Sequence, residues 1–120
     1  MQSTSTIAII DDSPSMRRAL DSLLRSLGFA VLSFESAEAF LAAAPAELSC
    51  IVTDVEMPGI SGIELHDVLC QQGSKLPFIF ITANSEQTVR LRLGPSACVL
   101  SKPFEVTELA DCISRSIQGA

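Results

Sequence analysis

Five short hydrophobic runs recur along the chain, and each of them stops at a polar residue or a turn. They span residues 6–10, 30–34, 50–53, 78–81 and 97–100. Runs of this length, rich in β-branched residues, are typical of strands that are buried on both faces of a parallel sheet. The pattern therefore predicts five parallel strands.

The segments between these runs have a different period, with hydrophobic residues three and four positions apart, as in amphipathic helices. The first helix is expected to begin after Ser13, an N-cap followed by proline, and to end at Gly28. Ser36 is expected to cap the second helix, and Ser61 with Glu64 forms the capping-box pattern that opens the third. The last helix carries its apolar stripe on residues 106, 109, 110, 113 and 117.

The fourth helix is the weakest element of this prediction. Asn84 or Ser85 is expected to cap it, and Pro95 ends it at about Gly94. Residues 85–93 then form little more than two turns, a length that is marginal for an isolated helix. We expect this helix to be short, mobile or displaced.

Strands that alternate with helices, without a linker or an internal repeat, predict a doubly wound α/β fold with right-handed crossovers. The chain has 120 residues, of which 48% are hydrophobic, and this is enough for one packed core. We therefore expect residues 1–120 to form a single domain.

Composition narrows the possible functions. The net charge of −6 argues against direct nucleic-acid binding by this domain, which would need a basic surface. Four widely spaced cysteines and a single histidine argue against a zinc site and favour free, mostly buried thiols. No hydrophobic run approaches the length of a membrane span and the start of the chain is no signal peptide, so we expect a cytoplasmic protein without membrane contact.

Polar residues stand where four of the five predicted strands end: Asp11 and Asp12, Asp54, Thr82 and Lys102. Singly, each has an ordinary explanation as a cap, a turn residue or a solvated charge. In a parallel sheet, however, they meet at one edge, where ligands of such folds bind. Clustered carboxylates favour Mg²⁺, and a lysine and a hydroxyl can bind phosphate oxygens. The set predicts phosphoryl transfer with a carboxylate nucleophile.

The motifs at these positions resemble the receiver domain of two-component response regulators. They are Ile9-Ile10-Asp11-Asp12-Ser13, Val52-Thr53-Asp54-Val55-Glu56-Met57-Pro58, Gly62, Phe80-Ile81-Thr82-Ala83 and Ser101-Lys102-Pro103-Phe104. The resemblance covers essentially the whole chain. The segment from Ser36 to Leu41 is most similar to the FixJ/NarL branch of transcriptional regulators.

The resemblance implies a CheY-like, flavodoxin-like sheet in the strand order 2-1-3-4-5. It implies that Asp54 is phosphorylated by a sensor histidine kinase, and that the domain is not itself an enzyme. The implied Mg²⁺ ligands are Asp11, Asp12, Asp54 and the backbone carbonyl of Glu56. Phosphoryl binding and switching fall to Thr82, Ala83 and Lys102, and the peptide bond before Pro103 is implied to be cis. A homodimer is a further implied state, and transcription would be controlled through a DNA-binding domain outside this chain.

Two features depart from the family pattern. Val99 stands where the family usually has an aromatic switch residue, and a small side chain that is stiff at χ1 cannot perform that rotation. Thr82 and Lys102 lie closer in sequence than is usual for the family. Glu56 either faces the phosphoryl site or is an ordinary exposed loop residue.

Positively charged and titratable residues elsewhere are assigned more modest roles. His66 is expected on the surface of the third helix and is not a candidate phosphohistidine. Arg17 and Arg18 either assist a phosphodonor or are solvated helix residues.

Three rival functions stay open. An aspartyl phosphohydrolase of the haloacid dehalogenase type usually has a second Asp where this chain has Glu56. A flavodoxin-like cofactor domain is disfavoured by Asp11 and Asp12, which would repel a flavin phosphate, and by the absence of Trp and Tyr. The third rival is a degenerate receiver that acts only as an interaction module. The chain itself is expected to be the amino-terminal part of a longer regulator rather than a stand-alone receiver.

Overall fold

The computed structural model describes residues 5–95 and 97–118 and contains five strands and five helices in strict alternation. The elements are β1 (Thr6–Ile10), α1 (Pro14–Ser26), β2 (Ala30–Phe34), α2 (Ala37–Ala43), β3 (Cys50–Asp54), α3 (Gly62–Gln71), β4 (Phe78–Thr82), α4 (Glu86–Leu93), β5 (Cys98–Ser101) and α5 (Val106–Gln118). All strand pairs are parallel, in the order β2-β1-β3-β4-β5. The predicted doubly wound α/β fold and its strand order are confirmed.

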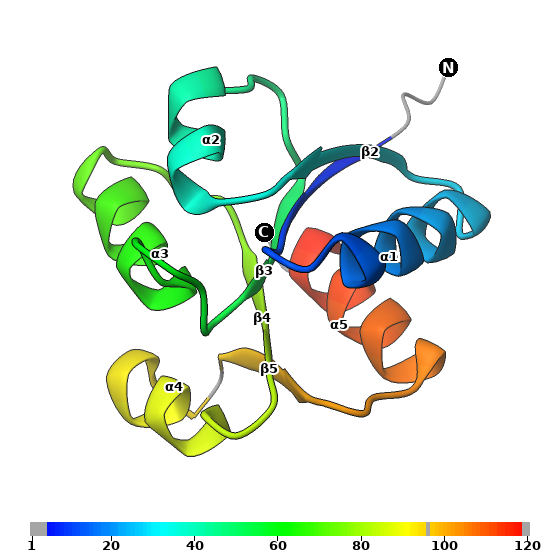
Figure 1. Ribbon diagram of the computed structural model, residues 1–120. Helices are drawn as coiled ribbons and strands as arrows, with labels where there is room; N and C mark the ends of the chain where they lie inside the picture. Colours follow the sequence, from blue (N-terminus) through cyan, green and yellow to red (C-terminus); the bar gives the residue numbers. More distant parts are fainter. Residues whose placement is uncertain (1–4, 96, 119–120) are drawn as a thin grey trace.

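Helices cover both faces of the sheet, with α1 and α5 on one face and α2, α3 and α4 on the other (Figure 1). Alternate residues of the strands therefore point into two separate hydrophobic clusters. Ile7 and Ile9 belong to the cluster beneath α1 and α5, whereas Ala8 and Ile10 belong to the opposite one. Both strand faces are buried, which is why the runs in the sequence are continuous instead of alternating.

The strand register brings the polar strand ends to one edge of the sheet. Ile10 pairs with Thr53, Asp54 pairs with Ile81, and Thr82 pairs with Ser101. The residues that follow β1, β3, β4 and β5 therefore emerge side by side, as expected for the carboxyl ends of parallel strands.

Three of the predicted helix caps are present. The hydroxyl oxygens of Ser13, Ser36 and Ser61 accept hydrogen bonds from backbone N–H groups three residues later, at 3.3, 3.0 and 3.1 Å. Glu64 completes the capping box by accepting a hydrogen bond from the Ser61 N–H at 2.9 Å. These side chains satisfy amides that a helix N-terminus leaves without partners.

The start of α4 differs from the prediction. Ser85 occupies the N-cap position, but neither its side chain nor that of Asn84 makes a capping hydrogen bond. Instead, the Thr82 hydroxyl oxygen accepts hydrogen bonds from the N–H groups of Asn84 and Ser85 at 3.2 and 2.8 Å. Ser85, one of the two predicted caps, is therefore the N-cap residue by position, but the expected side-chain capping bond is not formed.

The short length expected for α4 is confirmed, and an arginine ties the helix to the following loop. The Arg90 guanidinium donates to the carbonyls of Pro95 and Ala97, both at 3.0 Å, and to Glu86 at 3.1 Å. Glu86 also accepts a hydrogen bond from the Ser101 hydroxyl at 2.6 Å. These contacts link α4 to β5, which runs one residue later than the predicted 97–100.

The expectations for the cysteines, for His66 and for membrane-spanning segments can be compared with the structure. All four cysteines are free, but only Cys50 and Cys112 are buried, and Cys70 is exposed. His66 is partly exposed, with 25% of its side chain accessible, and its ring packs edge-on against Phe78 and Phe80 at centroid distances of 4.9 and 5.9 Å. No helix within the described residues is both long and apolar enough to cross a bilayer.

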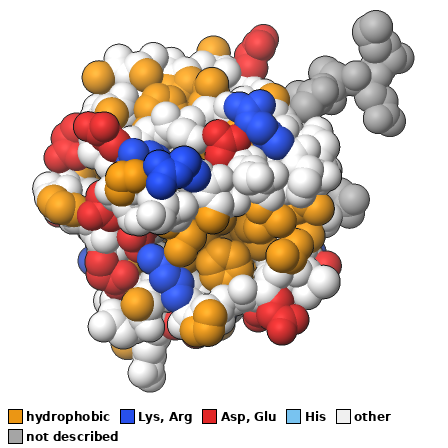
Figure 2. Space-filling view, turned by 45° about the vertical axis from the view of Figure 1, so that its right-hand side comes forward, with side chains coloured by type: hydrophobic (Ala, Val, Ile, Leu, Met, Phe, Trp, Pro, Cys, Tyr) orange, Lys and Arg blue, Asp and Glu red, His pale blue; other side chains and the backbone are white. Residues whose placement is uncertain are grey.

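The face formed by α1 and α5 carries charges of both signs around a group of hydrophobic side chains (Figure 2). Arg and Lys side chains lie next to acidic ones on the part of this face that is described, without a continuous basic surface.

Candidate functional site

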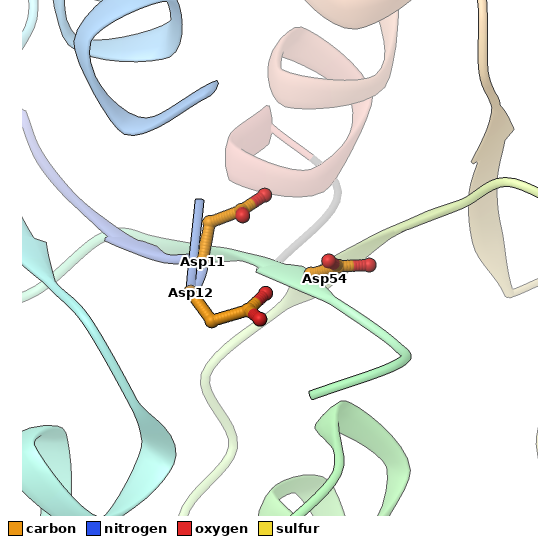
Figure 3. A group of neighbouring side chains, drawn as sticks. All are labelled: Asp11, Asp12 and Asp54. Atoms are coloured by element: carbon orange, nitrogen blue, oxygen red, sulfur yellow. The ribbon is translucent and has the colours of Figure 1, made fainter. Parts of the chain in front are cut away.

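Three carboxylates meet at the carboxyl edge of the sheet. Asp11 and Asp12 follow β1, Asp54 ends β3, and one oxygen of each lies within 4.8 Å of the others (Figure 3). Asp11 and Asp54 are 1% and 6% exposed, whereas Asp12 lies at the surface. The group is therefore open to solvent on the Asp12 side and closed beneath by the sheet.

Burial makes the two inner carboxylates costly to ionise. Loss of hydration and the neighbouring charge of Asp11 raise the pKa of Asp54 from 3.8 to about 6, although Lys102 acts in the opposite direction. Burial also raises the pKa of Asp11, against a hydrogen bond that its Oδ1 accepts from the Ser13 N–H at 2.9 Å. Carboxyl groups whose pKa is raised by burial beside other charges are common at functional sites.

The donor set fits a hard divalent cation. Oδ2 of Asp11 and Oδ1 of Asp54 are buried without a hydrogen-bond partner among the described residues. Buried carboxylate oxygens are seldom left unsatisfied, because each costs desolvation energy. Two such oxygens beside the exposed Asp12 offer the all-oxygen, partly hydrated surroundings that Mg²⁺ prefers.

A lysine lies beside the same group of carboxylates. The Nζ of Lys102 lies 3.8 Å from Oδ2 of Asp54, and its side chain is 29% exposed. Its backbone N–H donates to the Thr82 carbonyl at 2.8 Å, and the Lys102–Pro103 peptide bond is cis, as the resemblance implied. The distance of 3.8 Å places the ammonium group within reach of an anion bound at Asp54.

Thr82 lies between this site and the loop that joins β4 to α4, and is fully buried. Its hydroxyl donates to Oε2 of Glu56 at 2.8 Å. Burial by itself would raise the pKa of Glu56, but hydrogen bonds from Ser85 and Thr82 outweigh it and hold that pKa below its usual value. Of the two interpretations of Glu56, the structure supports the one in which its carboxylate faces the site.

Two further residues hold the acidic strand ends in place. A Cβ on Gly62 would lie 2.4 Å from the Asp54 carbonyl oxygen, so only glycine allows α3 to start this close to β3. The Arg17 guanidinium donates to the Asp11 carbonyl at 2.7 Å, which ties the first turn of α1 to the end of β1.

A response regulator receiver domain model matches residues 7–114 of the chain. The chain belongs to the response regulator receiver family. Among its relatives, Nodulation protein W of Bradyrhizobium diazoefficiens is 40% identical over 110 residues, which cover 89% of this chain and 48% of that protein. The transcriptional regulatory protein FixJ of the same organism is 38% identical over 117 residues, or 95% of this chain and 57% of that protein. A crystal structure of FixJ-N superimposes with a TM-score of 0.85 at 34% identity and covers 100% of this chain and 98% of that one.

This receiver domain therefore resembles FixJ-type regulators, as its motifs indicated, and it spans about half the length of the curated relatives that it matches. The predicted site residues Asp11, Asp12, Asp54, Thr82 and Lys102 are brought together. The part of the Glu56 backbone carbonyl in metal binding stays a prediction.

Two other predicted positions of the receiver are Ala83 and Val99, and the Ala83 backbone forms a hydrogen bond with the Glu56 carboxylate. Ala83 is exposed in the loop after β4. Val99 is buried on β5, at 7% exposure, in the same hydrophobic cluster as Phe80 and Val89. Its side chain fills core space there, which supports the view that it is no rotating switch.

Sequence reasoning missed two contacts of this receiver, the bond from Thr82 to Glu56 and the bond from Arg17 to Asp11. Arg17 stands one helical turn after the Ser13 cap, and this spacing was the only available signal. A groove of about 360 Å³ borders Arg17 and the exposed side of the acidic group; its walls are formed by Asp12, Pro14, Arg17, Glu35, Ser36 and Pro58.

Proposed function

We propose that this receiver domain accepts a phosphoryl group on Asp54 from a phosphohistidine of a sensor kinase. The observation that carries the proposal is the pair of unpartnered buried oxygens on Asp11 and Asp54 beside the Lys102 ammonium group. Such a site can bind a cation between the carboxylates and an anion beside the lysine, and a metal ion together with a phosphoryl group would match both.

In the proposed step, one oxygen of Asp54 attacks the phosphorus atom. A P–O bond forms, the P–N bond of the phosphohistidine breaks, and the departing imidazole nitrogen keeps the electron pair and takes up a proton. Asp11, Asp12 and Asp54 would hold Mg²⁺, with the Glu56 carbonyl as a further ligand. When bound, Mg²⁺ neutralises charge on the phosphoryl oxygens.

The other residues act on the transferred group. Lys102 pairs with a phosphoryl oxygen from its place 3.8 Å from Asp54. The Thr82 hydroxyl donates to a second oxygen, and Ala83 supplies a small side chain and a backbone N–H beside it. The groove at Asp12 and Arg17 is open enough for the donor to approach.

The outcome of phosphorylation is proposed to be control of transcription. This rests on relatives that are named transcriptional regulatory proteins and are about twice as long as this chain. Residues 1–120 would form one cytoplasmic receiver domain that passes its signal to a DNA-binding domain, with dimerisation as one route. The domain itself would not turn over a substrate as an enzyme.

The test is covalent modification of the purified protein. The wild-type protein is incubated with phosphoramidate and Mg²⁺, and its intact mass is compared with that of Asp54→Asn. We expect one added phosphoryl group in the wild type, and none in the variant or in the presence of EDTA. A modification that persists in Asp54→Asn would place the acceptor elsewhere.

A wild-type protein that neither gains mass nor binds Mg²⁺ would instead favour the degenerate interaction module. Multiple turnover of a phosphomonoester that depends on Asp54 would favour the phosphohydrolase.

A further inference from the structure

The hydrogen-bonding capacity of the Thr82 hydroxyl is fully used in this structure. A hydroxyl has one proton to donate and two lone pairs that accept. The proton goes to Glu56 at 2.8 Å, and the lone pairs receive the N–H groups of Asn84 at 3.2 Å and Ser85 at 2.8 Å. Because Thr82 is fully buried, no water is available to replace a lost partner.

This arrangement conflicts with phosphoryl binding. A phosphoryl oxygen at Asp54 has no proton, so it can only accept from Thr82. The hydroxyl cannot donate to Glu56 and to this oxygen at once, since it has a single hydrogen. The Glu56 carboxylate, two positions from Asp54, therefore already occupies the bond that the phosphoryl group requires.

From this we propose that Glu56 is an intramolecular competitor of the phosphoryl group for the Thr82 hydroxyl, and so a positioning residue that weakens retention of that group. The inference rests on the proposed function and concerns a side chain that the function itself does not need. The competition has two parts: Glu56 holds the only donated proton, and its negative charge stands close to where a phosphoryl dianion would form.

The position of Glu56 allows it to be displaced. It is exposed at the start of the loop between β3 and α3, at the edge of a surface groove that includes Met57, Ser85 and Thr88. When the phosphoryl group takes the Thr82 proton, the Glu56 carboxylate can turn into water.

The competition can be measured with beryllofluoride, a phosphoryl analogue that coordinates a carboxylate in the presence of Mg²⁺. Affinity is obtained from amide NMR titrations, in which the Asn84 and Ser85 signals report directly on their bonds to Thr82. Four proteins form a double-mutant cycle: wild type, Glu56→Ala, Thr82→Ala and the double variant. Glu35→Ala is the matched control, because Glu35 is an exposed acidic residue in the groove at Asp12.

We expect Glu56→Ala to bind beryllofluoride about tenfold more tightly than the wild type, the ratio typical of one hydrogen bond to a charged group. In the Thr82→Ala background the same substitution should gain about threefold or less, which is the share of the charge alone. Glu35→Ala should stay within about twofold of the wild type.

An equal gain in both backgrounds would overturn the proposal, because Glu56 would then act by charge without competing for Thr82. Unchanged or weaker binding by Glu56→Ala would also overturn it. Urea unfolding of each variant shows that the protein is folded and that altered stability does not explain the affinity. If the wild type neither binds beryllofluoride nor gains mass with phosphoramidate, the proposed function itself fails; if it does both, only the comparison of variants decides the role of Glu56.

Discussion

Replacing Asp54 by Asn should stabilise the metal-free domain at neutral pH, although Asp54 is the proposed functional centre. The pKa of this carboxyl is raised from 3.8 to about 6 by burial and by the charge of Asp11. A raised pKa means that the folded state binds the proton more tightly than the unfolded state. The contribution of Asp54 to the free energy of unfolding is therefore fully present below about pH 4 and is lost as pH rises through about pH 6.

The magnitude follows from that pKa difference. About two pKa units at ~1.4 kcal/mol per unit give a cost of about 3 kcal/mol for ionised Asp54 in the folded domain at about pH 7.5. Between about pH 7.5 and pH 5, Asp54 alone should change the free energy of unfolding by about 1.4 kcal/mol. An amide side chain at this position carries no charge, so Asp54→Asn should recover up to about 3 kcal/mol and lose this part of the pH dependence.

The measurement is urea unfolding in EDTA at both pH values, followed by far-UV circular dichroism because the chain has no Trp or Tyr. Asp111→Asn, an exposed carboxylate on α5, is the control and should stay within about 0.5 kcal/mol of the wild type. Addition of Mg²⁺ should stabilise the wild type more than Asp54→Asn. An Asp54→Asn variant that is no more stable than the wild type at pH 7.5, or that keeps the full pH dependence, would refute this reasoning.

Three further predictions concern the surroundings of the site. Asp12→Asn should weaken Mg²⁺ binding at least about tenfold in calorimetric titrations, because it removes the exposed charged ligand; unchanged affinity would exclude Asp12 from the site. Gly62→Ala should lower the free energy of unfolding by about 1–3 kcal/mol, since its Cβ would lie 2.4 Å from the Asp54 carbonyl; wild-type stability would show that α3 can shift. Arg90→Met should accelerate amide hydrogen exchange in α4 about tenfold by removing the bonds to two loop carbonyls, and unaltered exchange would show that these bonds do not hold the helix.

The succession of strands and helices along the chain, the main helix caps and the acidic edge of the sheet could all be predicted from the sequence. Continuous β-branched runs identify strands buried on both faces, and serines before helical periods identify caps. The polar site residues stand at or just after the ends of strands, and parallel strands necessarily bring their carboxyl ends together. These residues are Asp11, Asp12, Asp54, Thr82 and Lys102. These conclusions needed only local patterns and one general property of parallel sheets.

Other features depended on contacts between segments far apart in the chain. Glu56 and Thr82 are 26 positions apart, and only the β3–β4 register brings the carboxylate to the hydroxyl. The same hydroxyl also accepts hydrogen bonds from the N–H groups of Asn84 and Ser85, whereas the side-chain capping bond predicted for α4 is not formed. The contacts of the His66 ring with Phe78 and Phe80 depend in the same way on the packing of α3 against β4. The sequence by itself determined which groups reach the site, and the tertiary structure decided which of them are already bonded to one another, because hydrogen-bond partners are selected by three-dimensional proximity.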